Sequence, residues 1–312
     1  MATVSIRSLT KRFGRVLAVD GLSFDAPPGQ ITGFLGPNGA GKTTTLRSLV
    51  GLVRPTSGDA LIDGRRYRDL PNPRRVVGAV LESGASQPGR SGRDHLRVLA
   101  ANAGVGERRV DEVLDLVGLT DAAGRRASGY SLGMRQRLGL AGALLGEPEV
   151  LILDEPANGL DPEGIAWLRI MLPGLAAEGR SVLISSHLLS EVAQTVDRVV
   201  IIDHGQLRFA GPLGELGSGT VSVRAAEIDR LRDALTRAGY GVRLAAGALE
   251  VAGASPEEVG GVAAAQGIAL SGLIADSASL EAAFLQLTSS DEAPPAARAR
   301  RILSRPNARA AQ

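Results

Sequence analysis

The sequence predicts an α/β fold whose main domain carries a helical insert and is followed by a small second α/β domain. Over residues 3–216, short apolar runs typical of strands alternate with segments of helical spacing. Residues from about 87 to 146 interrupt this alternation with a mostly helical pattern. The alternation begins again over residues 220–288, after a Gly-Ser-Gly linker. A chain of 312 residues can bury one large core and a smaller one.

The main domain begins with strands. Residues 3–35 hold short apolar runs separated by turn signals, and the last run, ITGFLG, leads into a glycine-rich turn. The following text, TTTLRSLVGL, has helical spacing until an Arg-Pro-Thr-Ser-Gly stretch ends it. Further strands are predicted at residues 150–154, 180–186 and 198–211, with the helix candidate LLSEVAQTV between the last two.

The second domain repeats the pattern on a smaller scale. TVSVRA, VRLAAGALEVAG and IALSGLI predict strands, and IDRLRDALTRAG and PEEVGGVAAAQG predict helices. SLEAAFLQLT, residues 279–288, predicts an amphipathic helix that packs on this domain's own sheet. Residues 289–312 are rich in Pro, Ala and Arg and predict a disordered tail.

Composition limits the partners. The chain has no cysteine, which excludes disulfides and thiolate metal sites. The net charge is +2 and the only lysines are Lys11 and Lys42, so arginine supplies nearly all the positive charge. Arginine, alanine and glycine usage of this kind is typical of genomic base composition, and aromatic side chains for stacking on bases are scarce. We expect no nucleic-acid partner.

No targeting or membrane-spanning segment is predicted. The N-terminus lacks an apolar core with a cleavage site, and no run approaches the roughly 18 apolar residues of a bilayer span. We therefore expect a cytoplasmic protein, and any work at a membrane requires another polypeptide that crosses it.

A glycine-rich loop between a strand and a helix carries the first chemical signal. Glycines at its fixed positions let backbone N–H groups turn inward around an anion, and the positive end of the following helix adds to this attraction. Lys42 is then expected to reach the β- and γ-phosphates of a nucleotide and the Thr43 hydroxyl to bind Mg²⁺. The predicted nucleotide-binding residues of the loop are Gly36, Pro37, Asn38, Gly39, Ala40, Gly41, Lys42, Thr43 and Thr44.

A second signal is the apolar strand VLILD, residues 150–154, which ends in two acids. If this strand neighbours the strand before the loop in a parallel sheet, Asp154 lies beside the phosphates and would hold Mg²⁺. Glu155 would then polarise the water that attacks the γ-phosphate. Without the loop upstream, a solvated Asp-Glu turn would be the simpler interpretation.

A third signal is the segment YSLGMRQ before the helix RLGLAGALL, which places Ser131 and Gly133 at a helix N-terminus. This end of a helix can bind an anion. Taken alone, the segment also fits a serine N-cap on an ordinary helix.

These three segments, with YSLGMRQ lying between the glycine loop and the acids along the chain, resemble the ATP-binding subunit of an ABC transporter, over roughly residues 3–215. The resemblance implies an ABC-type P-loop NTPase fold, with Phe13 stacking on adenine and the glycine loop as Walker A. It also implies Ser131 to Gln136 as the signature, Asp154 and Glu155 as the Walker B acids, Asn158 to Pro162 as the D-loop and His187 as the switch histidine. Catalytic roles are thus expected for Lys42, Glu155 and His187.

Two departures mark a subgroup. The signature reads SLGMRQ rather than SGGQ, and Glu82 stands where most members have glutamine. Both features, together with the closing helix near residue 284, resemble the drug and antibiotic exporters of the bacitracin and daunorubicin kind, whose membrane subunits are separate proteins. Glu82 is a further candidate ligand for Mg²⁺, although its charge lies beside the phosphates.

The resemblance implies an ATPase that uses Mg²⁺ and works as a head-to-tail homodimer with ATP at the interface. Such a dimer would energise transport, with export of a drug or antibiotic expected, through a separate integral membrane permease at the inner face of the cell membrane. An alternative is a soluble ABC ATPase acting on the ribosome or DNA, but such proteins usually carry two cassettes or a long coiled-coil insertion. Another is a regulatory protein that binds nucleotide without turnover, against which Glu155 and His187 argue.

The position of Glu82 gives a first test. Glu82→Gln is expected to leave ATP affinity unchanged in a nucleotide-binding assay, because the position mainly couples the site to the partner. Loss of ATP binding in this variant would contradict that role.

Overall fold

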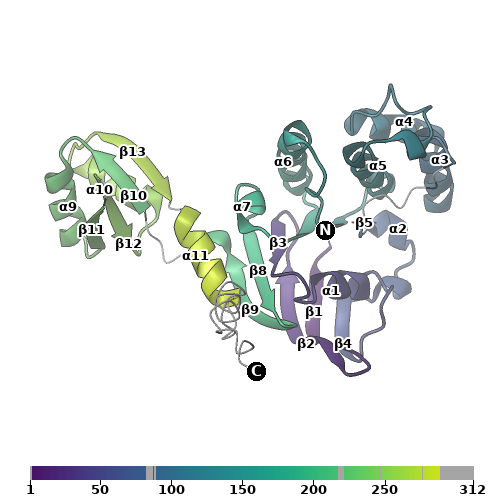
Figure 1. The fold of residues 1–312 in the computed structure, drawn as a ribbon, viewed down its shortest axis with the longest axis horizontal. Coiled ribbons are helices and arrows are strands. Elements are labelled where there is room, and N and C mark those ends of the chain that lie inside the picture. The colour runs from purple at the N-terminus through teal and green to yellow at the C-terminus, as the bar shows by residue number, and fades with distance from the viewer. Residues whose placement is uncertain are drawn as a thin grey trace, which may run out of the picture.

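The computed structural model describes residues 2–81, 87, 89–216, 221–245, 247–275 and 277–288. Figure 1 shows a sheet-based core, a helical lobe beside it and a small domain on the opposite side of the core. Of the helices in these described ranges, none is long and apolar enough to cross a lipid bilayer.

The N-terminal part of the core is a three-stranded antiparallel sheet in the order β2-β1-β4. The predicted strands of this region are β1 (Val4–Phe13) and β2 (Val16–Ala26), which form a hairpin. The third strand, β4 (Ser57–Ile62), was not predicted, because its turn-like start hides it. Gly58 in this start has φ 76°, and a Cβ there would lie 2.2 Å from the Ser8 carbonyl oxygen, so only glycine permits β4 to pair with β1.

The second sheet has six strands in the order β5-β6-β7-β3-β8-β9, all parallel except for the antiparallel β8–β9 pair. Both faces are buried, which explains why its strands are almost continuously apolar. The carboxyl ends of the parallel strands meet along one edge. The strands are β3 (Ile31–Leu35), β5 (Val77–Val80), β6 (Val150–Asp154), β7 (Ser181–Ser186), β8 (Arg198–Asp203) and β9 (Gln206–Pro212).

Helices accompany these sheets. The helix predicted at LLSEVAQTV is shorter than expected, a single turn, because the Asp197 carboxylate accepts a hydrogen bond from the Ile31 N–H at 2.7 Å and draws the chain back into the sheet. The helices are α1 (Lys42–Leu49), α2 (Pro73–Val76), α6 (Pro162–Ala177), α7 (Leu189–Val192) and α8 (Leu213–Leu216).

The helical lobe occupies the range predicted for the insert. It contains α3 (Gly92–Ala103), α4 (Glu107–Leu116) and α5 (Leu132–Leu144). Side chains cap two of these helices at their N-termini: Ser91 accepts from the Asp94 N–H, and Ser131 accepts from the Met134 N–H. The lobe shares its apolar core with one face of the six-stranded sheet, so it is packed on the core as well as connected to it.

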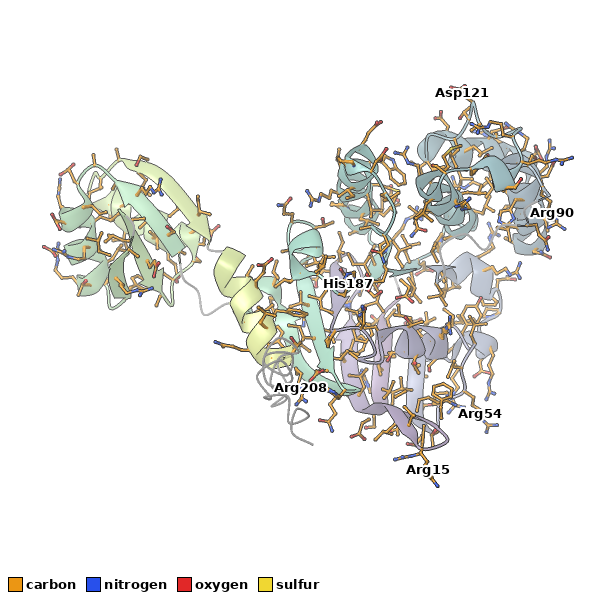
Figure 2. All side chains as sticks on the ribbon, in the orientation of Figure 1. Arg15, Arg54, Arg90, Asp121, His187 and Arg208 are labelled. Atoms are coloured by element: carbon orange, nitrogen blue, oxygen red, sulfur yellow. The ribbon has the colours of Figure 1, made fainter. Side chains whose placement is uncertain are left out.

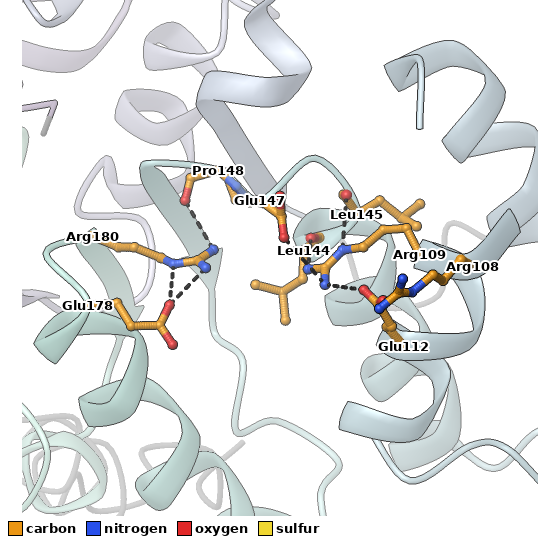
Figure 3. A network of polar contacts seen from close by, with 9 residues as sticks. All are labelled: Arg108, Arg109, Glu112, Leu144, Leu145, Glu147, Pro148, Glu178 and Arg180. Atoms are coloured by element: carbon orange, nitrogen blue, oxygen red, sulfur yellow. Dashed lines mark hydrogen bonds and ion pairs between the residues drawn. The ribbon is translucent and has the colours of Figure 1, made fainter. Parts of the chain in front are cut away.

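Two arginines hold the chain where α5 returns to the sheet (Figure 3). From α4, Arg109 donates to the carbonyl oxygens of Leu144 at 2.9 Å and Leu145 at 3.3 Å at the C-terminal end of α5. From the core side, Arg180 donates to the Pro148 carbonyl oxygen at 3.3 Å. The insert and the core therefore fix the same short connection from opposite sides.

The small domain has a four-stranded antiparallel sheet in the order β11-β12-β10-β13, with two helices packed on it and on each other. It buries an apolar core separate from that of the main domain. Its elements are β10 (Val221–Ala225), α9 (Ile228–Arg237), β11 (Gly241–Ala245), β12 (Ala248–Ala252), α10 (Pro256–Ala265) and β13 (Leu270–Ala275).

The closing helix α11 (Ser277–Thr288) contradicts one expectation. It was expected to pack on the small sheet, but it packs against α7, α8, β8 and β9 of the main domain (Figure 1). Leu280, Phe284 and Leu287 fall on one helical face and join the main core. The small sheet already has α9 and α10 over its core, which leaves the apolar face of α11 for the main domain. The predicted tail, residues 289–312, lies outside the described residues.

Replacing Arg109 by alanine tests the joint at the end of α5. We expect Arg109→Ala to lower the free energy of unfolding by about 1–2 kcal/mol, measured by chemical denaturation, because partly buried carbonyl groups lose charged donors. The matched control is Arg108→Ala, whose exposed side chain pairs with Glu112 across one turn. Equal effects of the two substitutions would contradict a role for Arg109 in this joint.

Candidate active site

The glycine-rich loop lies between the end of β3 and the start of α1. A Cβ at Gly36 would lie 2.3 Å from the Ile202 carbonyl oxygen, and one at Gly41 would lie 2.4 Å from the Ala18 carbonyl oxygen. Gly39 and Gly41 also have φ values of 84° and 105°. The backbone path that curls this loop before α1 therefore requires glycine, and it leaves the helix N-terminus facing an enclosed concave loop.

Lys42 lies inside this loop with its side chain only 6% exposed. Its Nζ donates to the carbonyl oxygens of Gly36 at 2.7 Å and Pro37 at 3.3 Å, and it lies 3.6 Å from Glu155 Oε1. Burial lowers the pKa of Lys42, and the nearby carboxylates of Glu155 and Asp154 oppose that shift. A buried cation satisfied by its own loop is well placed to bind an anion that enters the loop.

Asp154, at the end of β6, is buried and held on both oxygens. Thr43 Oγ1 donates to Asp154 Oδ2 at 2.8 Å, and the Ser185 hydroxyl donates to Asp154 Oδ1. The condition stated from the sequence, that the strands before the loop and before the acids are neighbours, is wrong, because β7 lies between β3 and β6. Helix α1 nevertheless contacts β6 across the intervening strand, so Thr43 still reaches Asp154.

Glu155 and His187 meet on the other side of Lys42. Glu155 adopts φ 50°, outside the strand conformation, and its N–H donates to Ser185 Oγ at 3.0 Å. Its Oε2 lies 2.8 Å from His187 Nδ1. His187 follows the end of β7 and lies near the middle of the molecule (Figure 2). Hydrogen bonds through Ser185 thus connect both acids and the histidine, and an ion pair joins the loop lysine to Glu155.

The other predicted site residues lie apart from this group. Phe13, at the end of β1, is 48% exposed, and the Lys11 ammonium lies 4.6 Å from its ring centroid. Ser131 and Gly133 begin α5 in the helical lobe, away from α1 (Figure 1). Glu82 lies outside the described residues.

Comparison with known proteins identifies the family. Residues 19–158 match the family described as ABC transporter. Over 211 residues the chain is 46% identical to an uncharacterized ABC transporter ATP-binding protein, YhcH, of Bacillus subtilis, an alignment that covers 66% of this chain and 69% of that protein. This chain belongs to the ABC transporter ATP-binding proteins. It is accordingly an ATPase.

Other relatives of this ABC ATPase have names that specify transport. The bacitracin transport ATP-binding protein BcrA of Bacillus licheniformis is 44% identical and is matched over 68% of this chain and 71% of its own length. The lantibiotic transport ATP-binding protein SrtF of Streptococcus pyogenes is 38% identical, over 65% of this chain and 88% of its own. Residues 219–281 match a family described as a domain of unknown function (DUF8746).

Two solved structures resemble the cassette. One, described as the ATP-binding subunit of an ABC transporter, has a TM-score of 0.64 and 29% identity, and the match covers 68% of this chain and 91% of that one. The other, a bacterial ABC transporter cassette titled as the dimeric structure of MJ0796, has a TM-score of 0.62 and 22% identity, over 67% and 98% of the two chains. At 22% identity, the match to the second structure shows a similar fold and nothing about function.

Sequence reasoning missed the contacts of two residues that organise this ABC site. Ser185 bridges the Asp154 carboxylate and the Glu155 backbone, although the only sign of it was a polar pair, Ser-Ser, at the end of an apolar strand. On α5, the buried Gln136 side chain donates to the Pro156 carbonyl oxygen at 3.3 Å and so connects the signature helix to the segment after Glu155. Their partners lie some 20 to 30 residues away in the chain, beyond the reach of local patterns.

Ser185 can be tested as a positioning residue of the ABC ATPase. We expect Ser185→Ala to raise the Mg²⁺ concentration needed for half-maximal ATPase activity about tenfold, because Asp154 loses one of its two donors. Ser185→Thr is expected to restore most of the loss. The control is Ser181→Ala, which removes a buried hydroxyl at the far end of the same strand, bonded to the Ala26 carbonyl oxygen. A fall in stability with no change in Mg²⁺ requirement would contradict this role.

Proposed function

We propose that this ABC ATPase hydrolyses ATP with Mg²⁺ in a head-to-tail homodimer and thereby drives export of an antibiotic through a separate membrane permease. The observation that carries the proposal is the group formed by Lys42, Asp154, Glu155 and His187 around the glycine loop. Lys42 supplies a cation that can bind phosphate, and Asp154 supplies a carboxylate that can bind a metal ion. The Glu155 carboxylate contacts His187.

The residues fit ATP and Mg²⁺. The loop offers backbone N–H groups and the ammonium of Lys42 to the β- and γ-phosphates. The Thr43 hydroxyl and the Asp154 carboxylate are hard oxygen donors 2.8 Å apart, which is the kind of ligand set that Mg²⁺ uses together with phosphate oxygens. Bound there, Mg²⁺ would neutralise charge on the phosphates.

Glu155 and His187 would act on the attacking water. The Glu155 backbone N–H donates a hydrogen bond to Ser185 Oγ, while the Glu155 carboxylate contacts His187 and Lys42. That carboxylate would orient the water and accept its proton in the transition state. His187 would hold the Glu155 carboxylate through Nδ1 and leave its other nitrogen for the γ-phosphate. Lys42 would stabilise the charge that develops on the transferred group.

A second copy would complete the site. In one chain the signature residues Ser131 and Gly133 begin a helix in the lobe, apart from the glycine loop, so each chain presents two unlike halves of a site. Apolar side chains flank both halves: Leu132 beside the signature and Leu188 beside His187 are each 44% exposed. A head-to-tail pair would cover both and bring Ser131 of each copy to the nucleotide of the other. A cassette of similar fold is described as dimeric, which is consistent with a pair of copies.

Transport is supported by the named relatives. Bacitracin and lantibiotics are antibiotics, and the proteins named for their transport are ATP-binding proteins similar to this chain. We infer that this chain is cytoplasmic and is held at the inner face of the membrane by its permease. Motion of the helical lobe would pass to that permease. These relatives favour this role over action on the ribosome or DNA.

Replacing Glu155 by glutamine tests the chemistry and the dimer together. We expect Glu155→Gln to bind ATP with unchanged affinity but to hydrolyse it about 10²–10⁴-fold more slowly, because the acceptor for the water proton is lost. The trapped ATP is then expected to shift the protein from monomer to dimer in sedimentation velocity runs with ATP and Mg²⁺.

Lys42→Ala is the control for this experiment. It is expected to lose ATP binding and therefore to remain monomeric at every ATP concentration. Normal turnover by Glu155→Gln would exclude Glu155 as the base, and a monomer with bound ATP would contradict the dimer.

A further inference from the structure

His187 lies at the junction of a sheet strand and a short helix. On its N-terminal side, β7 is fixed in the six-stranded sheet between β3 and β6. On its C-terminal side, the chain turns at once, because Ser186 Oγ donates to the Leu188 carbonyl oxygen at 3.1 Å and accepts from the Leu188 N–H at 3.0 Å. Helix α7 begins at the next residue. The position of the His187 imidazole, 2.8 Å from Glu155 Oε2, therefore depends on where α7 lies.

Helix α7 has little stability of its own. It is a single turn, and the side chain of its N-cap residue, Leu188, forms no capping hydrogen bond. A helix this short does not persist in water unless it packs against other elements. Leu189 and Val192 are 3% and 6% exposed, so burial of these apolar side chains is what holds α7 in place.

The closing helix α11 supplies part of this packing. Helix α7 packs against β7 and against α11. Phe284 of α11 is 9% exposed and belongs to the same apolar cluster as Leu189 and Val192, and Leu280 and Leu287 pack against that cluster from the same helix. Because an aromatic ring fills a large volume, loss of the Phe284 ring would leave a cavity in the cluster that holds α7.

Helix α11 also connects this cluster to the small domain (Figure 1). It begins two residues after the end of β13, an edge strand of the small sheet. Among the described residues of the C-terminal region, those that join the main core beyond α8 all come from α11. The rest of that region has a separate core. A shift of the small domain would therefore reach α7 through α11.

We propose that α11 holds α7 in place and that Phe284 is a positioning residue for ATP hydrolysis, which acts through α7 on His187. The inference rests on the proposed role of His187 beside Glu155 and adds the C-terminal region to the parts that set the hydrolysis rate. Lys42 is held by carbonyl oxygens of its own loop, so ATP binding is expected to survive the loss of Phe284. Displacement of a catalytic group by about 1 Å can slow a reaction by about 10²-fold.

Steady-state kinetics of the full chain test this proposal. Phe284→Ala is expected to lower kcat about tenfold and to change KM for ATP by less than about twofold. Phe284→Leu keeps a large apolar side chain and is expected to retain most of the kcat. The control is Leu285→Ala on the same helix, because the Leu285 side chain is 62% exposed and its loss is expected to leave kcat unchanged.

A double-mutant cycle separates positioning from general destabilisation. His187→Ala alone is expected to lower kcat, because the Glu155 carboxylate loses its histidine partner. If Phe284 acts through His187, adding Phe284→Ala to His187→Ala is expected to cause little further loss. Nucleotide titration and thermal unfolding would show that each variant is folded. If Phe284→Ala does not fold, Leu280→Ala takes its place in the cycle, since Leu280 is a partly buried residue one turn earlier on α11.

A wild-type kcat in Phe284→Ala, equal losses in Phe284→Ala and Leu285→Ala, or an undiminished loss in the His187→Ala background would overturn the proposal. A rise in KM that accounts for the whole effect would also overturn it, because α11 would then act on ATP binding. The proposed function fails separately, and is recognised by wild-type hydrolysis in Glu155→Gln or His187→Ala, whatever the result for Phe284→Ala.

Discussion

The parallel pairing of β7 between β3 and β6 is the constraint on which the active site depends. Residues from all three strand ends meet because the strands run in the same direction and end at one edge. Ser185, in register with Asp154, bridges the two acids, and His187 follows it to hold Glu155. If β7 shifted by one residue, its side chains would change faces and both contacts would be lost together.

Helix α5 connects the functional regions of the molecule. Its N-terminus carries Ser131, and its buried Gln136 contacts the segment after Glu155. Arg109 fixes its C-terminal end from the insert. A rigid helix that begins at Ser131 and contacts the segment after Glu155 is a physical route by which a change at one can reach the other.

The C-terminal region shows how a small domain is attached to a cassette. The sheet of residues 221–275 has its own core, while α11 returns to the main domain and places Phe284 among the residues buried there. The small domain is therefore held at its end by a helix that packs on β8 and β9, the strands beyond β3. Disturbance of α11 would reach the core of the cassette as well as the small domain.

The sequence by itself determined the local chemistry: the glycine loop, the two acids after an apolar strand, the serine at the start of α5 and the histidine after β7. Each depends on residue types at short spacing, which folding cannot alter. Only the tertiary structure decided that β7 lies between β3 and β6, that Ser185 joins the acids, that β4 pairs with β1 and that α11 leaves the small sheet. These features depend on contacts between residues far apart in the chain. Several apolar faces could pack on the same core, and the spacing of residues along the sequence does not specify which of them does so.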